Sequence, residues 1–187
     1  KPNRFSSTLN MIFAGQFRAG KNQDILIHAL HDYIAQTGDK NLVLYLPGSG
    51  DLLPVAQRLA GDLCISESIV FPGQLNRREM LELYNNCQIA MVPTNSETFG
   101  HCIAEPLVLQ KIVISRPVGV AIDAIEHGSN GFLFETTGEL IQILLKIRNM
   151  SPEELANISA HAKETGEMFR WENIAKRHYQ EVFRNLF

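Results

Sequence analysis

Two carboxylates flank a glycine turn in the middle of the chain, and their spacing could bind a phosphorylated sugar. Glu97 lies in a loop after a short apolar run, and Glu105 lies in the apolar stretch after Phe99-Gly100, which we read as a helix. The first amides of a helix lack intrahelical partners and carry the positive end of its dipole, so they suit an anion. Ionised carboxylates accept hydrogen bonds from hydroxyl groups. A phosphorylated polyol, such as a nucleotide sugar, would use both kinds of group.

Each of these residues also has a plainer interpretation. Glu97 could cap the helix that follows it. Glu105 has apolar neighbours, so it could be buried in an ion pair. His101 beside Cys102 could form a nucleophile pair. We favour a structural interpretation of both residues: His101 packs at the end of the loop and supplies an amide, and Cys102 acts as a small hydrophobic residue.

A second charged loop lies near the N-terminus, where Arg18 and Lys21 follow an apolar run that ends at Gly15. A strand, a glycine-containing loop, a basic residue and a helix form an arrangement typical of phosphate binding. The loop matches neither the dinucleotide fingerprint nor the Walker pattern. The alternative is a solvated loop edge, which is the usual environment of loop charges.

The elements that would position these residues alternate along the chain. Apolar runs bounded by turn residues predict six strands, at 10–15, 42–46, 68–71, 88–92, 112–115 and 132–134. Helical patterns fill the gaps and continue at 139–149, 151–165 and 171–184. This alternation predicts an α/β fold with a doubly wound parallel sheet, whose ligand site lies at the carboxyl ends of the strands. All the candidate loops follow strands, so we expect them along one edge.

Several helix starts carry capping signals. Asn22 and Asp51 each precede a helical pattern and are expected to cap it. Asn76 with Glu79 resembles a capping box, as does the Ser151 segment that continues Pro-Glu-Glu. Pro106 is tolerable if its helix begins near residue 102 or 103. Leu81, Leu83 and Tyr84 are expected to pack inward.

Composition narrows the possible classes. The 187 residues are 45% hydrophobic and carry a net charge of −3, which suits one globular domain and does not favour nucleic acid as a partner. No apolar stretch approaches the length of about 20 residues that a transmembrane helix needs. Three widely spaced cysteines fit neither a metal motif nor a disulfide framework, so we expect a cytoplasmic protein. The chain begins Lys1-Pro2, without a Met, and reads as part of a longer protein.

Glu97 and Glu105, with seven residues between them and Phe-Gly after the first, resemble the Glu-x7-Glu signature of glycosyltransferase family 4, the group 1 glycosyl transferases. The resemblance covers nearly the whole chain, as a C-terminal donor-binding domain. It implies a Rossmann-like parallel sheet of about six strands, the C-terminal half of a GT-B fold. Residues 1–9 would be the remnant of a linker from a missing N-terminal domain. Residues 10–187 would be the nucleotide-sugar domain, including the C-terminal helices.

The resemblance also implies roles for residues. The family's Gly-Arg-x4-Lys loop grips the pyrophosphate, and Gly15 and Lys21 match it, but Gln16 stands at the Arg position, where Arg18 could substitute. Glu97 would accept from sugar hydroxyls and act with Lys21 in catalysis. Glu105 would accept from both ribose hydroxyls. The segment from Gln74 to Asn76 would read the base edge through backbone groups, and the amides of Phe99 to Cys102 would hold the sugar and the distal phosphate. The implied donor-binding set is Gly15, Gln16, Arg18, Lys21, Gly48, Leu75, Glu97, Phe99, Gly100, His101, Cys102 and Glu105.

One further segment departs from the family pattern, and another resembles it. Gln110-Lys-Ile112 departs from the family's Gly-x-Pro turn, at the amino end of the next strand, where we expect little functional effect. The Trp171 helix resembles the family's last helix, which packs against the other domain.

The implied activity is transfer of a sugar, with retention, from a nucleoside-diphosphate sugar to a glycan or lipid-linked acceptor in bacterial surface polysaccharide synthesis. Neither a metal nor a cofactor beyond the donor is expected. Contact with the inner face of the cytoplasmic membrane would come only through the missing domain or the acceptor. The isolated domain should bind nucleotide but transfer nothing. Two alternatives remain: a nucleotide-sugar epimerase of the same architecture, and a non-catalytic nucleotide-sugar binding module, which Gln16 favours.

Overall fold

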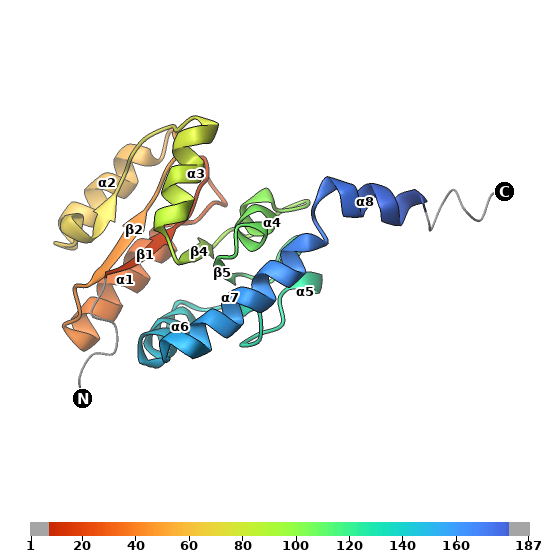
Figure 1. The fold of residues 1–187 in the computed structure, drawn as a ribbon. Coiled ribbons are helices and arrows are strands. Elements are labelled where there is room, and N and C mark those ends of the chain that lie inside the picture. Colours follow the sequence, from red (N-terminus) through yellow and green to blue (C-terminus); the bar gives the residue numbers. More distant parts are fainter. Residues whose placement is uncertain (1–7, 180–187) are drawn as a thin grey trace.

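The computed structural model describes residues 8–179 of the chain, and within them six parallel strands form one sheet (Figure 1). The strand order is β3-β2-β1-β4-β5-β6, so the chain winds outward from β1 in one direction and then from β4 in the other. This confirms the predicted doubly wound α/β fold. The strands are β1 Leu9–Ile12, β2 Leu42–Tyr45, β3 Ile69–Val70, β4 Ile89–Val92, β5 Ile112–Ser115 and β6 Gly131–Leu133.

Helices cover both faces of the sheet. Right-handed crossovers that run in opposite directions from the centre place their helices on opposite faces. Accordingly, α1 packs against α2 and α6, whereas α4 packs against α7. The helices are α1 Gln23–Thr37, α2 Leu53–Asp62, α3 Arg77–Asn86, α4 His101–Val108, α5 Ala121–Ala124, α6 Thr137–Asn149, α7 Pro152–Glu167 and α8 Trp171–His178, with a 3₁₀ turn at Ser66–Ser68.

The capping predictions were partly right. The boxes at Asn76 and Ser151 are both formed, with Glu79 and Glu154 reaching back to the cap amides. Asp51 does not cap α2, which begins after Leu52 without a side-chain capping bond. Asn22 precedes α1, but its side chain makes no capping bond because it binds a neighbouring loop instead.

Two predictions about packing were wrong. Helix α4 begins at His101, which places Pro106 inside the helix rather than in its first turn. There the proline has no amide hydrogen to donate to the carbonyl of Cys102, so the helix lacks that one bond. Leu81 is 40% exposed rather than packed inward, whereas Tyr84 on the same helix is buried as expected.

The hydrophobic core lies on both sides of the central strands. All four residues of β4 and all four of β5 are buried, as expected for strands covered by helices on both faces. Helix α8 instead extends away from the sheet (Figure 1). Its first residue, Trp171, is 83% exposed, so this side chain is not part of the domain core. Residues 180–184 of the predicted last helix and the linker segment 1–7 lie outside the described residues.

Candidate functional site

The loops that follow the strands meet at the carboxyl edge of the sheet and hydrogen-bond to one another. The amide of Gly15 donates to the carbonyl of Pro47 at 3.1 Å, and that of Gly48 donates to the carbonyl of Gly73 at 2.8 Å. Gly48 has a φ of 145°, and a Cβ there would lie 2.0 Å from the carbonyl oxygen of Gly15. Only glycine permits this close approach. The loops after β1, β2 and β3 therefore form one continuous edge.

Lys21 and Glu97 meet at this edge as an ion pair, with 2.5 Å between Nζ and Oε1. They are 76 residues apart in sequence, and their side chains are only 17% and 15% exposed. Partial burial strengthens the pair because water screens it less. The alternative in which Glu97 caps α4 is wrong, since the N-cap residue is Gly100 and no side chain caps this helix. An incoming anion would compete with Glu97 for Lys21.

The start of α4 presents free amides beside this pair. Gly100 adopts a left-handed conformation with φ of 96°, and the amides of Phe99, Gly100 and His101 have no acceptor within residues 8–179. The loop after β5 holds the turn, because the amide of Val120 donates to the carbonyl of Phe99 at 2.9 Å. A Cβ on Gly119 would lie 2.6 Å from that same oxygen. The amides are thus oriented by the neighbouring loop and remain available to a ligand.

The Cys102 thiol contacts Glu97, and its surroundings disfavour the thiolate form that a nucleophile needs. The thiol donates to Oε1 of Glu97 at 3.7 Å. Burial, followed by the charge of Glu97, raises the pKa of the Cys102 thiol to about 12. The thiolate is therefore scarce near neutral pH. His101 is exposed, and its ring lies edge-on to Phe99 at 5.3 Å between centroids, which fits the packing interpretation.

Glu105 is exposed on α4, about one turn beyond the free amides. The alternative of a buried ion pair is therefore wrong. Burial, with a smaller contribution from the Glu105 charge, raises the pKa of Tyr84 on α3, which indicates that the carboxylate lies near this tyrosine. The apolar neighbours of Glu105 pack into the core while its own side chain faces solvent. It is available to accept hydrogen bonds from a ligand.

Other predicted residues lie on the same edge without touching the ion pair. The side chain of Gln16 is exposed, and its carbonyl accepts from Gln23 at 3.0 Å. The exposed Arg18 borders a hollow between α1 and α2, together with Leu52. Leu75 is half-buried in the loop between β3 and α3. The structure therefore brings Lys21, Glu97 and the start of α4 together, and leaves Arg18 beside a different surface.

Sequence reasoning missed three residues that link these loops. Asn22, Asn95 and Arg116 hydrogen-bond to one another at the carboxyl edge. The sequence predicted only a capping role for Asn22, and the implied donor-binding set includes none of the three residues. No local pattern marks such contacts, because each one joins residues at least 21 positions apart.

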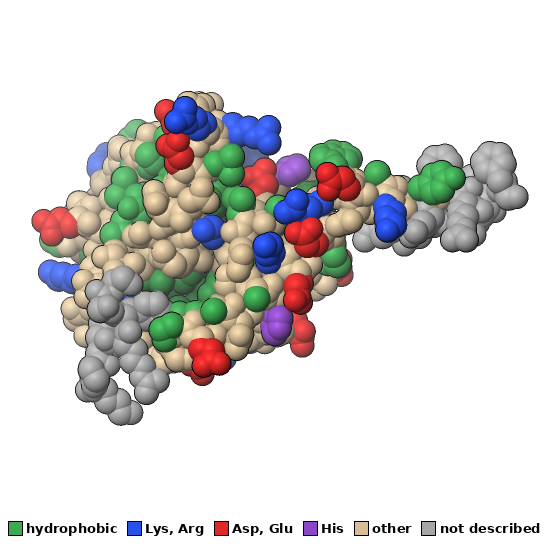
Figure 2. Space-filling view, in the orientation of Figure 1, with side chains coloured by type: hydrophobic (Ala, Val, Ile, Leu, Met, Phe, Trp, Pro, Cys, Tyr) green, Lys and Arg blue, Asp and Glu red, His purple; other side chains and the backbone are tan. Residues whose placement is uncertain are grey.

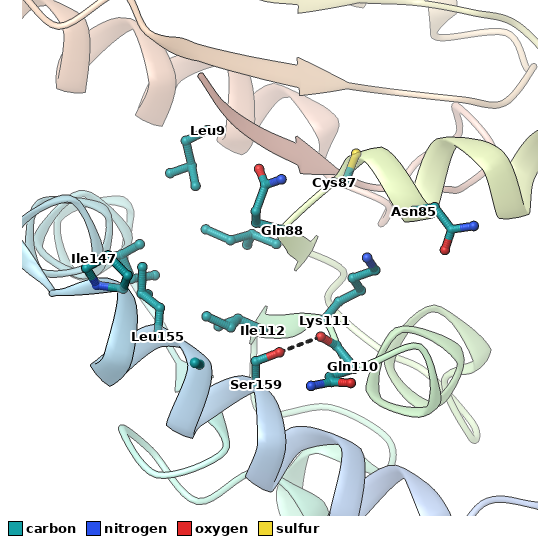
Figure 3. A pocket seen from close by; sticks show the side chains of 13 residues that line it. Leu9, Asn85, Cys87, Gln88, Gln110, Lys111, Ile112, Ile147, Leu155 and Ser159 are labelled. Atoms are coloured by element: carbon teal, nitrogen blue, oxygen red, sulfur yellow. Dashed lines mark hydrogen bonds between the residues drawn. The ribbon is translucent and has the colours of Figure 1, made fainter. Parts of the chain in front are cut away.

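A cavity of about 370 Å³ lies at the opposite edge of the sheet (Figure 3). It is lined by Leu9 and Ile112 at the amino ends of their strands, and by Gln110 and Lys111 before β5. Ser159 on α7 donates to the Gln110 carbonyl across it at 2.7 Å. The Gln110 turn thus lies away from the candidate site, as predicted, and none of the predicted site residues lines this cavity.

Within residues 8–179, no three side chains from His, Cys, Asp or Glu gather as metal ligands would. The helices in this range also lack the combination of length and apolar character that a bilayer crossing requires.

The fold is a doubly wound, parallel α/β domain whose candidate site lies at the carboxyl edge of the sheet, and comparison with known proteins assigns its family. The family model of the group 1 glycosyl transferases matches residues 1–165. The chain therefore belongs to this family. A D-inositol 3-phosphate glycosyltransferase from Rhodococcus jostii is 29% identical over 174 residues, which cover 87% of this chain and 37% of that protein. The chain spans about two fifths of the length of the curated relatives it matches.

Solved structures share the fold. The C-terminal domain of LpcC, a group 1 glycosyl transferase from Francisella tularensis, has a TM-score of 0.76 at 16% identity, over 87% of this chain and 86% of that domain. HepE from Anabaena, solved with UDP and glucose, has a TM-score of 0.80 at 21% identity, over 96% of this chain and 48% of HepE. At these identities the likeness concerns the fold, which is the Rossmann-like C-terminal half of a GT-B protein.

Proposed function

We propose that this chain is the donor-binding domain of a retaining glycosyltransferase and that it holds a UDP-sugar at the carboxyl edge of the sheet. One observation carries the proposal: the Lys21–Glu97 pair lies beside the free amides of α4, with Glu105 exposed on the same helix. Family membership supports sugar transfer. The structural relative HepE, solved with UDP and glucose, supports uracil as the base.

Each group has a proposed role in holding the donor. Lys21 and the amides at the start of α4 would bind the diphosphate, since both carry positive charge or its partial equivalent. Glu105 lies about 6 Å along the axis from His101, a reach that suits the ribose hydroxyls. Glu97, once released from Lys21, would accept from hydroxyls of the sugar. The backbone around Leu75 would border the base. Arg18 is exposed in the same loop as Lys21, and reaching the phosphates would require its side chain to turn away from the hollow between α1 and α2.

These residues would act on the leaving group. In transfer, the bond between the anomeric carbon and the phosphate oxygen breaks, and the acceptor hydroxyl oxygen forms the new bond on the same face. The acceptor hydroxyl gives up its proton to water. The nucleoside diphosphate leaves with added negative charge on its oxygens. Lys21 and the α4 amides would stabilise that charge as it develops, which is the form of catalysis that preorganised donors supply.

The acceptor site belongs, in this proposal, to a second domain that precedes β1. The expected linker boundary at residue 9 shifts by one residue, because Leu9 already belongs to β1, and the residues before Leu9 would be the end of the connecting linker. This chain alone should bind the nucleotide and transfer no sugar, because the edge described here carries groups for the donor only. The acceptor would be a glycan or lipid-linked sugar in polysaccharide synthesis at the cytoplasmic face of the membrane. Measurable transfer by the 187-residue chain would contradict this part of the proposal.

The test is calorimetric titration of the chain with UDP, GDP and ADP. We expect UDP to bind most tightly and Glu105→Ala to weaken it about 10- to 100-fold, because a charged acceptor of two hydroxyl bonds is lost. Glu153→Ala is the matched control, since Glu153 is exposed near the start of α7, between residues that line the cavity at the opposite edge of the sheet. Failure of all three nucleotides to bind, or equal UDP affinity in Glu105→Ala, would overturn the proposal.

Variants at Gln16 help to distinguish a donor-binding domain of an active enzyme from a non-catalytic binding module. Gln16 stands where the family resemblance places an arginine, and its side chain is exposed. Restoring the cation in Gln16→Arg should tighten UDP binding about tenfold, because a charged donor binds phosphate more strongly than a neutral one. Arg18→Ala should weaken UDP binding if Arg18 is the substitute. A full-length protein that turns over UDP-sugar with Gln16 in place would exclude the non-catalytic alternative.

A further inference from the structure

We propose that Asn22, Asn95 and Arg116 form a clamp of positioning residues that holds Lys21 and Glu97 together. The inference rests on the proposed function, because it assigns these residues to the same donor site. It goes further by naming side chains that the ligand need not touch.

Asn22 is the first part of the clamp. It follows Lys21 directly and adopts a left-handed backbone, with φ of 56° and ψ of 40°, which is uncommon for any residue other than glycine. Its Nδ2 donates to the carbonyl of Pro93 at 2.9 Å and to Oδ1 of Asn95 at 2.7 Å. Asparagine tolerates this conformation better than most residues. The side chain thereby joins the Lys21 loop to the loop that carries Glu97.

Asn95 is the centre of the clamp. Its amide donates to the carbonyl of Gly20 at 3.0 Å, so the two loops are also joined through their backbones. Gly20 and Asn22 flank Lys21, and Asn95 lies two residues before Glu97. The contacts between the loops therefore lie on both sides of Lys21 in sequence and just before Glu97. A shift of either loop would separate Nζ of Lys21 from Oε1 of Glu97.

Arg116 connects Asn95 to the loop that follows β6, the last strand of the sheet. It follows β5, and its Nη1 donates to Oδ1 of Asn95 at 3.1 Å while Nη2 donates to the carbonyl of Glu135 at 3.1 Å. Glu135 precedes the capped start of α6, where Glu139 accepts from its amide at 2.7 Å. A guanidinium can make both bonds at once because its donors lie in a fixed fork.

The direction of the hydrogen bonds within the clamp determines which variants can test it. Arginine has no acceptor, so Asn95 must turn its Oδ1 toward Arg116. The Nδ2 of Asn22 then donates to that same oxygen. Glycine at position 22 retains the left-handed backbone without strain and removes only the side-chain bonds. Lysine at position 116 retains the charge but lacks the planar fork.

The first experiment measures the Lys21–Glu97 coupling without any nucleotide. Urea unfolding of the 187-residue chain is followed for Lys21→Met, Glu97→Gln and the double variant, and the cycle is repeated in Arg116→Met and in Asn22→Gly. We expect the coupling to fall to half or less in both backgrounds. Arg58→Met is the control, because Arg58 is exposed on α2, and the coupling should persist there. Unchanged coupling in both Arg116→Met and Asn22→Gly would overturn the clamp.

The second experiment measures UDP affinity by calorimetry in Arg116→Met and Arg116→Lys. A clamp predicts that both variants bind UDP about tenfold more weakly, because each loses the bridge between Asn95 and the Glu135 carbonyl. Wild-type affinity in Arg116→Lys, with a loss only in Arg116→Met, would show that Arg116 acts by its charge and would overturn the clamp. If the unmodified chain does not bind UDP, the proposed function fails, and the coupling cycle still decides whether the clamp exists.

Discussion

At the residue scale, the surroundings of a side chain decide which chemistry it can perform. Cys102 in α4 and Glu97 in the loop before it are in contact, yet their surroundings differ, because Glu97 pairs with Lys21 while burial raises the pKa of the Cys102 thiol to about 12. Desolvation disfavours the charged thiolate, so this side chain acts as a small apolar residue. Cys87 behaves like Cys102, since burial raises the pKa of its thiol to about 12. Sequence position alone would not have separated these roles.

The thiols provide a test with a defined pH dependence. At pH 8, iodoacetamide should modify the exposed Cys64 first, while Cys87 and Cys102 react slowly. Because their pKa values are raised, the rates at these two residues should increase about tenfold per pH unit up to about pH 11, in step with the thiolate fraction. Mass spectrometry of peptides gives the rates, and the urea-unfolded chain is the control. Modification of Cys102 as fast as Cys64 at pH 8 would contradict this account.

At the scale of elements, a buried ion pair ties α6 to the turn after α1. Arg148 on α6 is 4% exposed and binds Oδ2 of Asp39, at 2.8 Å through Nε and 2.7 Å through Nη2. The hydroxyl of Tyr33 donates to the same carboxylate oxygen at 3.1 Å. Burial raises the pKa of Tyr33, and the nearby Asp39 charge raises it further. The contact helps hold α1 in place, and α1 begins directly after the Lys21 loop.

Breaking this pair should destabilise the whole domain. Asp39→Asn replaces the carboxylate that Arg148 and Tyr33 both bind with a neutral amide, so we expect the free energy of unfolding to fall by about 3 kcal/mol. Asp32→Asn is the control, because Asp32 pairs with His31 at the surface and should change stability by less than about 0.5 kcal/mol. Urea unfolding measures both variants. Equal stability of Asp39→Asn and wild type would show that the pair is not needed to hold α1.

At the scale of the whole molecule, the last described helix, α8, and the residues next to it expose large apolar side chains to solvent. Figure 2 shows apolar side chains along the projecting end of the chain. Trp171 and Tyr179 are 83% and 65% exposed there, and Met168 before them is 45% exposed. Exposed apolar residues that cluster in this way mark interaction surfaces. The family resemblance implies that this helix packs against the second domain of the proposed full-length enzyme.

The exposed helix predicts a contrast between two aromatic residues. Trp171→Ala should leave the free energy of unfolding of this chain within about 0.5 kcal/mol of wild type, because the side chain contacts little of the domain. Phe132→Ala, in the core, should lower it by about 3 to 5 kcal/mol. Trp171 is the only tryptophan of the chain, so iodide should quench its fluorescence readily in the folded protein. A stability loss in Trp171→Ala comparable to that of Phe132→Ala would mean that α8 packs onto the domain.

The sequence by itself determined the features that are encoded locally. The alternation of strands and helices, the capping boxes at Asn76 and Ser151 and the turn at Gly100 each depend on residues a few positions apart. Periodicity and capping chemistry express these short-range preferences directly. For the same reason the parallel sheet followed from the pattern, since strands joined by helices have few alternative arrangements.

Only the tertiary structure decided which side chains meet. Lys21 pairs with Glu97 across 76 residues, and Asn22 serves a neighbouring loop rather than its own helix. Burial of Cys102 and exposure of Glu105 also depend on how α4 is seated between its neighbours. These outcomes follow from the strand order, which places the loops after β1, β4 and β5 side by side. Local sequence carries no record of that order, because contacts between distant segments form only when the sheet is assembled.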